Sequence, residues 1–436
     1  MKEYENALRY LNSFTNYEKI GFTDMKKEFD PGGLRKVLKD SGDPQESYRS
    51  IHVAGTKGKG SICTFVSSIL EEAGYSVGLF TSPHLTDITE RIKINDKNIS
   101  REHFAQVLKE TEKYLTPEAK SEFTYFEVLT LAAILYFSLR KVDFAVFEAG
   151  MGGRLDATNV IDAEVSIISP ISYDHIQVLG GSLEEIAGEK AGIIKSGTYC
   201  VSSPQDESVL RVVSDKCREK GASLSIVGRD ITYDVVDPGI EGSEFNIHAE
   251  QNYEGCYTKM PGIFQAANAA AAVGACERIK DEKTLSRDVI KRGLEKAFIP
   301  GRLEVLARNP MVVIDGAQNV ASAENLKYSV EQLFKYDRLI LLLGLSGDKD
   351  IRGVCESLVP ASDEVVLTRA SGRRAADPLL VRGYIRNRRV KITSDIKEGL
   401  GAALHMAKPG DLILATGSFY VIGEVREFVL KGMTDQ

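Results

Sequence analysis

The sequence has few cysteines, and none of them is paired as metal sites and disulfide frameworks require. The 436-residue chain contains six, and no two of them lie in a C-x-x-C pair. Neither a zinc ribbon nor a disulfide-stapled fold is therefore expected. Scattered cysteines are typical of a reducing compartment, so we expect a cytoplasmic protein.

Long hydrophobic runs are also lacking. The longest lies at residues 129–139 and includes Thr130 and Ser138, and this run of eleven residues is too short to span a bilayer. The first residues, MKEYENALRYL, mix acidic and basic side chains and contain no apolar signal region. We therefore expect neither a membrane anchor nor a signal peptide.

Positive charge is not in excess. Lys and Arg together number 55 and Asp and Glu 62, so the formal net charge is −7. A long nucleic-acid groove is not expected, because phosphate backbones are usually bound by a surplus of basic residues. A local basic pocket for a small molecule is compatible with this balance.

The composition that remains is that of a soluble globular protein, with 43% hydrophobic and 27% charged residues. This much apolar material can offset the entropy that the chain loses on folding, which excludes a disordered chain. At roughly 150 residues per domain, the length fits two or three domains, each able to bury a core.

Strand-like apolar runs alternate with helical patterns, which predicts an α/β fold built from parallel βαβ units. The expected strands lie at residues 50–54, 76–81, 143–147, 165–168 and 198–202, and then at 311–314, 338–343, 364–367 and 411–415. Expected helices include 61–73, 126–140 and 265–276, and residues 227–260 suggest a small β excursion. A Pro300-Gly301 break predicts a phosphate-loop-type domain with a mostly parallel sheet over residues 1–298 and a smaller Rossmann-like α/β domain over 299–436.

The strongest local motif is the glycine-rich turn between the first expected strand and the helix after it, SIHVAGTKGKGS at 50–61. Backbone N–H groups of such a turn can surround a phosphate, the helix N-terminus adds a favourable dipole, and Lys59 adds a positive charge. The strict phosphate-loop pattern places a hydroxyl directly after the lysine, but this chain has Gly60 there. A hydroxyl would have to come from Ser61 or from another loop.

A carboxylate, Glu148, ends a second buried strand and is followed by a glycine cluster at 150–153. In open α/β sheets, ligands bind at the carboxyl ends of parallel strands, and phosphoryl transfer needs an acid there to hold Mg²⁺. His175, beyond the strand at 165–168, has a similar position. A structural role for either residue is the alternative.

A lysine occupies a core position of the helix that the capping box at 182–185 predicts. Leu183, Ile186, Ala187 and Ile194 form its apolar stripe, and Lys190 falls on the same stripe. A buried lysine is costly unless it is paired or chemically altered. A lysine that extends past the helix end to solvent is the structural alternative, and a site lysine that reacts with CO₂ to give a carbamate is the functional one.

Further polar residues follow strands in the second half, namely those of Pro300-Gly301-Arg302, Asp315–Asn319, Asp348-Lys349-Asp350 and Gly417–Tyr420. Each motif is weak alone. Their common position at strand ends predicts one face turned toward a cleft between the domains.

These motifs together resemble the folylpolyglutamate synthase/dihydrofolate synthase family of Mur-type ATP-dependent amide ligases. The most specific stretches are HVAGTKGKGS at 52–61, TSPHL at 81–85, FEVLT at 126–130, EAGMGGRLDATN at 148–159, DHIQVLGGSLEEIAGEKAGIIK at 174–195, PGRLEV at 300–305 and GSFY at 417–420. The resemblance extends from about Leu11 to Glu424, nearly the whole chain.

The resemblance implies ATP and Mg²⁺ as cofactors and assigns a role to individual residues. ATP would contact Gly55, Thr56, Gly58, Lys59, Gly60, Ser61, Asn268, Arg302 and Asp315. Mg²⁺ would be held by Ser82, Glu148 and His175, so that Ser82 supplies the hydroxyl that Gly60 lacks. Lys190 corresponds to a carbamylated lysine and would be catalytic together with Lys59, Glu148 and His175. The pterin substrate would lie near Thr124, Leu155, Asp156 and Ala157, and the incoming glutamate near Ser418.

Two residues depart from the family pattern. Gln318 replaces the His of a DGAHN motif on the glutamate side, and Phe264 replaces a His beside the nucleotide. The first departure concerns amino-acid specificity, and the second concerns details of the nucleotide pocket.

The implied reaction joins L-glutamate to a pterin or folate carboxylate through an acyl phosphate, in a monomer whose partners are small molecules. Another Mur-type amide ligase with a different acceptor or amino acid is one alternative. A non-ligase phosphate-loop protein, either a kinase or a nucleotide switch, is another, although the chain has no N-K-x-D guanine motif.

Overall fold

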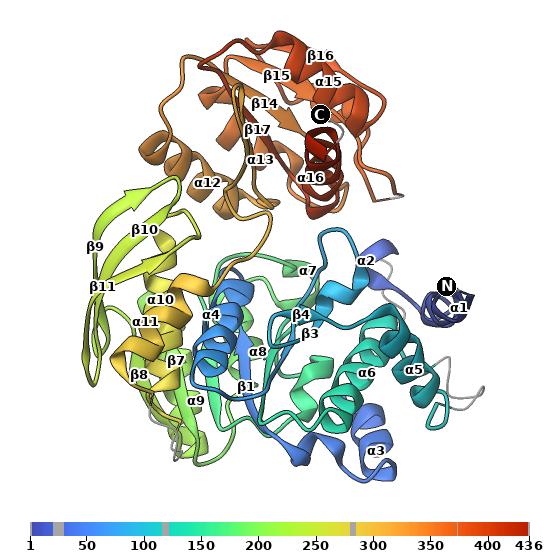
Figure 1. The fold of residues 1–436 in the computed structure, drawn as a ribbon, viewed down its shortest axis with the longest axis vertical. Helices are drawn as coiled ribbons and strands as arrows, with labels where there is room; N and C mark the ends of the chain where they lie inside the picture. Colours follow the sequence, from blue (N-terminus) through green and yellow to red (C-terminus); the bar gives the residue numbers. More distant parts are fainter. Residues whose placement is uncertain (1, 21–29, 116–121, 280–284, 373, 435–436) are drawn as a thin grey trace.

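Two mainly parallel sheets, one in each part of the chain, organise the protein (Figure 1). The computed structural model describes residues 2–20, 30–115, 122–279, 285–372 and 374–434. Within these ranges, no helix combines the length and the apolar character that crossing a membrane requires. The predicted α/β class is confirmed.

The larger sheet has the strand order β4-β3-β2-β5-β1-β6-β7-β8. Its strands are β1 (Arg49–Ala54), β2 (Val77–Phe80), β3 (Ile92–Ile94), β4 (Lys97–Asn98), β5 (Phe144–Glu148), β6 (Val165–Ile168), β7 (Tyr199–Ser202) and β8 (Ser223–Ile226). The strands from β2 to β8 in this order pair in parallel, and only β3 pairs antiparallel, with β2 on one side and β4 on the other. The central strands are buried on both faces, which is why their sequences are continuous apolar runs.

Helices cover both faces of this sheet (Figure 1). One core lies under α4 (Lys59–Glu72), α10 (Phe264–Cys276) and α11 (Arg287–Lys296), and the other under α1 (Lys2–Leu11), α3 (Gly32–Asp40), α5 (Arg101–Thr111) and α6 (Tyr125–Leu139). All alanines of α10 except Ala267 are buried, because small side chains let this helix approach its neighbours closely.

The predicted β excursion is confirmed as a three-stranded antiparallel sheet. It consists of β9 (Thr232–Gly239), β10 (Gly242–His248) and β11 (Asn252–Thr258). Phe245, Tyr253 and Cys256 attach it to the core beside α10.

The second sheet has the order β12-β13-β17-β14-β15-β16, with only β12 antiparallel. Its strands are β12 (Glu304–Arg308), β13 (Met311–Ile314), β14 (Leu339–Leu343), β15 (Glu364–Leu367), β16 (Arg389–Ile392) and β17 (Leu412–Thr416). Around it lie α12 (Val320–Leu333), α13 (Ile351–Leu358), α14 (Pro378–Arg382), α15 (Ile396–Met406) and α16 (Phe419–Thr434).

Of the remaining helices, α2 (Tyr17–Ile20) precedes β1. The others connect strands of the larger sheet and are α7 (Ile176–Leu179), α8 (Leu183–Ala191) and α9 (Glu207–Lys220). Ser182 caps α8 with the predicted box. The prediction was wrong for Ile194, which is buried but lies beyond the end of α8. The helix that the prediction began at residue 61 starts at Lys59, because Gly58 takes the cap position.

Candidate active site

A cavity of about 500 Å³ lies where the carboxyl ends of the two parallel sheets face each other. Loops that follow β1, β2, β5 and β6 line one side, and loops that follow β13, β14 and β17 line the other. The predicted site residues that line it are Gly55, Thr56, Gly58, Lys59, Gly60, Ser61, Ser82, Thr124, Glu148, Leu155, Asp156, Ala157, His175, Lys190, Asn268, Arg302 and Asp315. Ser418 is buried next to the lining residues Phe419 and Tyr420 but does not itself line the cavity.

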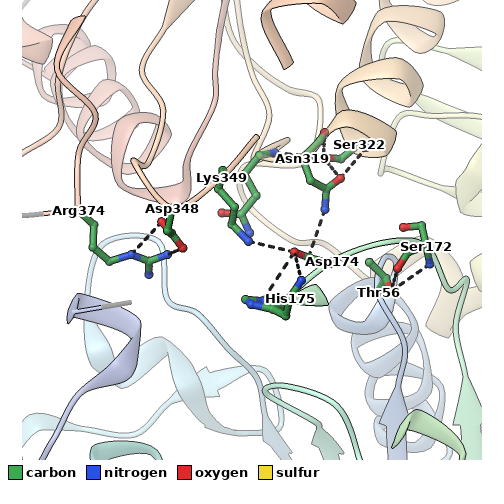
Figure 2. A network of polar contacts seen from close by, with 10 residues as sticks. Thr56, Ser172, Asp174, His175, Asn319, Ser322, Asp348, Lys349 and Arg374 are labelled. Carbon is green, nitrogen blue, oxygen red and sulfur yellow. Dashed lines mark hydrogen bonds and ion pairs between the residues drawn. The ribbon is translucent and has the colours of Figure 1, made fainter. Parts of the chain in front are cut away.

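The glycine-rich turn is tied to the loop that follows β6. The backbone N–H groups of Thr56 and Lys57 donate to the carbonyl oxygen of Pro170 at 3.0 and 3.2 Å. The Thr56 hydroxyl donates to the Ser172 carbonyl oxygen and accepts from the Ser172 N–H, at 3.1 and 3.2 Å (Figure 2). The turn and the segment that contains His175 are therefore hydrogen-bonded to each other and together line one side of the cavity.

Gly58 shows why this turn needs glycine. Its φ of +77° lies in the left-handed region, and a Cβ at this position would come within 2.6 Å of the Asn268 side-chain oxygen. The structure thus brings Asn268, from α10, against the turn, as the prediction requires.

Glu148 at the end of β5 is the buried acid of the site. Its Oε2 accepts a hydrogen bond from the backbone N–H of Ser82 at 3.1 Å, and its Oε1 lies 3.9 Å from Nζ of Lys59. Burial raises the pKa of the Glu148 carboxyl, and the positive charge of Lys59 opposes that shift in part. Three elements that are distant in sequence therefore meet at one carboxylate.

The donor atoms here fit Mg²⁺ rather than a metal that needs a complete protein cage. Among the described residues, no group of three or more His, Cys, Asp or Glu side chains is arranged to hold a metal ion. Mg²⁺ is usually bound through one or two carboxylates together with substrate phosphates and water. The Glu148 carboxylate and the Ser82 hydroxyl, beside the glycine-rich turn, suit that chemistry.

His175 is uncharged at neutral pH. Its Nε2 lies 3.9 Å from Oδ1 of Asp174 (Figure 2). Burial lowers the pKa of His175 to about 4, although the charge of Asp174 opposes the shift. A neutral imidazole is the form that can donate a lone pair to a metal.

Lys190 is buried in the floor of the cavity. Its Nζ donates to the carbonyl oxygen of Gly55 at 2.9 Å. Burial, reinforced by the charge of Lys59, lowers the pKa of Lys190 to about 7. The predicted core position of Lys190 is therefore confirmed, and the alternative of a side chain that reaches solvent is wrong.

The residues predicted to hold the pterin substrate are themselves held by local hydrogen bonds. Thr124 caps α6 through a box with Glu127. Asp156 accepts hydrogen bonds from the N–H groups of Met151 and Thr158 at 2.8 and 3.0 Å, and burial raises the pKa of its carboxyl. These contacts fix the glycine cluster that begins at residue 150.

On the other side of the cavity, Asp315 accepts backbone hydrogen bonds from Leu303 at 3.0 Å and Ala317 at 2.9 Å. The guanidinium of Arg302 lies over the ring of Phe419, 4.8 Å from its centroid. Burial raises the pKa of Asp315, and the charge of Arg302 opposes that shift. Arg302 and Asp315 are thus held beside each other at the start of the C-terminal part.

Several lining residues were not predicted as site residues. They include Asn16, Tyr17, Glu18, Asn319, Lys349 and Arg374. Arg374 forms an ion pair with Asp348 (Figure 2). It also donates to the backbone carbonyl oxygen of Glu18. The strand-end motifs containing Asn319 and Lys349 were noticed in the sequence, but no local pattern signals a contact between Glu18 and Arg374.

Comparisons with known proteins agree with this geometry. Residues 53–276 match the Mur ligase middle domain, and residues 301–419 match the Mur ligase glutamate ligase domain. The dihydrofolate synthase/folylpolyglutamate synthase of Bacillus subtilis is 33% identical over 406 residues, which cover 91% of this chain and 94% of that protein.

Solved structures are similar over almost the whole chain. Mycobacterium tuberculosis folylpolyglutamate synthase, complexed with ADP and AMPPCP, has a TM-score of 0.89 and 30% identity, with 98% of each chain covered. The bifunctional folylpolyglutamate synthase/dihydrofolate synthase of Yersinia pestis, complexed with AMPPNP and Mn ion, has a TM-score of 0.84 and 28% identity, again with 98% of each chain covered. The predicted family resemblance is confirmed: this chain belongs to the dihydrofolate synthase/folylpolyglutamate synthase family of Mur ligases.

Proposed function

We propose that this chain is an ATP-dependent ligase that joins L-glutamate to the carboxylate of a pterin or folate, as dihydrofolate synthase, folylpolyglutamate synthase or both. The observation that carries the proposal is the single cavity in which the glycine turn, Lys59, Glu148 and loops of the second sheet meet. A ligase of this kind needs a nucleotide, an acid and an amine in one place.

The first step is activation of the acid. An oxygen of the substrate carboxylate attacks the γ-phosphorus of ATP, the bond to ADP breaks, and an acyl phosphate forms. The N–H groups from Gly58 to Ser61 and the Lys59 ammonium bind the phosphates, and Asn268, Arg302 and Asp315 position the rest of the nucleotide. Ser82, Glu148 and His175 would hold Mg²⁺, which when bound offsets negative charge on the phosphates.

The second step is capture by the amino acid. The uncharged amine of glutamate attacks the acyl carbon, phosphate leaves from the tetrahedral intermediate, and the amine proton is lost to solvent. Thr124 and Leu155-Asp156-Ala157 would lie along the pterin, and Ser418 would lie near the glutamate. An acyl phosphate hydrolyses in water, so a cavity enclosed by two domains protects it.

Lys190 is proposed to carry a carbamate. Its neutral Nζ would attack CO₂, forming a C–N bond and releasing a proton, and a carbamate anion would result. The low pKa of the buried amine supports this step, because only the neutral form is a nucleophile.

We also propose that the domain division lies near residue 299 and that the chain acts as a cytoplasmic monomer. The division is supported by separate hydrophobic cores before and after this point. All six cysteines are buried and unbridged, which suits a reducing compartment. One copy supplies both sides of the cavity, and sedimentation with and without nucleotide would test the monomer.

The deciding experiment measures ADP release with L-glutamate, in parallel with dihydropteroate and with tetrahydrofolate, and identifies the product by mass spectrometry. Glutamate-dependent ADP release with either acceptor supports the proposal. Release with UDP-linked acceptors alone would favour another Mur-type ligase, and release without an amino acid would favour a kinase or a nucleotide switch.

A further inference from the structure

Asp174, in the loop after β6, contacts both parts of the chain (Figure 2). Its Oδ1 accepts a hydrogen bond from the backbone N–H of His175 at 3.0 Å and lies 3.1 Å from Nζ of Lys349. Its Oδ2 accepts a hydrogen bond from Nδ2 of Asn319 at 3.3 Å. One carboxylate therefore joins His175 to two loops of the second sheet.

The ion pair with Lys349 is shielded from water. The Lys349 side chain is 8% exposed and the Asp174 side chain 18%. Removing one partner of such a pair leaves the other charge poorly compensated, so the pair strongly favours the docked arrangement of the two loops.

Asn319 is oriented toward Asp174 by its own helix. It caps α12, and its Oδ1 accepts hydrogen bonds from the N–H and the hydroxyl of Ser322 at 2.9 and 2.8 Å (Figure 2). Because the helix uses the oxygen end of the amide, the NH₂ end faces Asp174. The start of α12 and the loop after β6 are therefore held together.

His175 has a backbone conformation that needs such support. Its φ of 50° and ψ of 37° lie in the left-handed region, which residues with a side chain rarely adopt. The hydrogen bond from the His175 N–H to the Asp174 carboxylate favours this conformation. A displaced Asp174 carboxylate would therefore also disturb the direction of the His175 ring.

We infer that Asp174 is a positioning residue that makes the placement of the His175 ring depend on docking of Lys349 and Asn319 across the cavity. The catalytic consequence rests on the proposed function, whereas the physical link does not. If the C-terminal part were undocked, the glycine-rich turn would still be formed, but the His175 ring would be misplaced.

The test uses the full chain with Lys349→Met, Asp174→Asn and Asn319→Ser, where serine can still cap α12 but lacks the NH₂ group. For each variant we expect kcat to fall about 10- to 100-fold, because a displacement of about 1 Å can cost that much, while KM for ATP changes less than about threefold. Circular dichroism and thermal melting confirm that each variant folds, and Asn319→Ser still tests the link if Lys349→Met does not fold.

A second readout is independent of activity. Spin labels on cysteines introduced by Leu139→Cys and Leu404→Cys, both at exposed positions, report the distance between the two parts with AMPPCP and Mg²⁺ bound. The six native cysteines are buried and should not be labelled. We expect each of the three variants to broaden the distance distribution. A loss of kcat with an unchanged distribution would overturn the inference.

A double variant and a matched control complete the design. Asp174→Asn with Lys349→Met should be no worse than Asp174→Asn alone, because the first change already removes the ion pair with Lys349, whereas fully additive losses contradict the inference. Arg308 forms an ion pair with Glu241 that also joins the two parts, but these side chains are 61% and 65% exposed. Arg308→Ala should change kcat by less than about twofold, because exposed pairs contribute little. If the wild type ligated no glutamate, the proposed function would fail while the spin-label distances still tested the link.

Discussion

Burial is the main cause of the shifted pKa values of single residues in the site, because it disfavours the charged form of each side chain. Lys190 and His175 have lowered pKa values and Glu148 has a raised one, and in each case burial is the largest cause. Protein stability alone would not favour such groups in the interior. The loss of stability that such buried ionisable groups cause is expected at sites where an amine or an acid must react at neutral pH.

The first prediction concerns pH and Lys190. With a pKa of about 7, its amine is protonated below that pH and neutral above it. CO₂ adds only to the neutral amine, so the carbamate signal in ¹³C NMR with labelled bicarbonate should rise between about pH 6 and about pH 8. Lys190→Arg should abolish the signal, and Lys195→Arg, in the segment after α8, should leave it unchanged. A signal that survives in Lys190→Arg would place the carbamate elsewhere.

The second prediction concerns Glu148. Glu148→Gln keeps an acceptor for the Ser82 N–H but removes the negative charge, so kcat should fall about 10²- to 10³-fold. The affinity for AMPPCP, measured by calorimetry, should lose most of its dependence on Mg²⁺. Glu164→Gln, which changes the ion pair with Arg49 at the opposite ends of the strands, is the control and should stay near wild-type activity. Full activity in Glu148→Gln would contradict the metal assignment.

At the scale of an element, the strand–turn–helix from β1 to α4 depends on backbone shape more than on side chains. Gly58 supplies a left-handed cap, and α4 starts directly after it. The same helix ends at Glu72, and Gly74, two residues farther on, has a φ of +85°. Both glycines have a positive φ, but a Cβ on Gly58 would meet the Asn268 side chain, whereas a Cβ on Gly74 would meet open space.

The third prediction uses this matched pair. Gly58→Ala and Gly74→Ala should each lower the free energy of unfolding by about 1–2 kcal/mol, because alanine is disfavoured at positive φ. Only Gly58→Ala should also weaken AMPPCP binding, since its Cβ would displace Asn268, whereas the space around Gly74 is open. Denaturant unfolding and calorimetry on both variants test this, and equal loss of nucleotide affinity would show that the contact with Asn268 has no role.

At the scale of the whole molecule, the site exists only while the two sheets face each other. Close packing between α16 and the segment after β2 contributes to this arrangement: a Cβ on Gly423 would lie 2.2 Å from the Leu85 carbonyl oxygen. No such contact surrounds Gly432 farther along α16.

The fourth prediction follows from that contact. Gly423→Ala should push the C-terminal part outward and lower kcat/KM by about 10-fold or more, because the reacting groups lose their alignment. Gly432→Ala, in the same helix, should leave activity unchanged and slightly favour the helix. Steady-state kinetics and the spin-label distance described above would check both variants. Wild-type kinetics in Gly423→Ala would mean that this packing does not set the alignment.

Much of the phosphate side of the site could be predicted from sequence because its determinants are local. A strand followed by a glycine turn and a helix placed Lys59, and strand-end acids placed Glu148 beside it, since parallel strands end at the same edge. The stripe of α8 placed Lys190 in the interior. The error at Ile194 arose because an apolar residue beyond a helix end can be buried without being helical.

Sequence by itself determined the α/β class, the glycine turn and the position of Lys190 on an apolar helix stripe, because each depends on residues that are neighbours along the chain or on one helix face. Only the tertiary structure decided that Glu18 meets Arg374 and that Asp174 meets Lys349 and Asn319. These partners come from opposite parts of the chain, and their contact depends on how two independently formed sheets dock, which no local periodicity encodes.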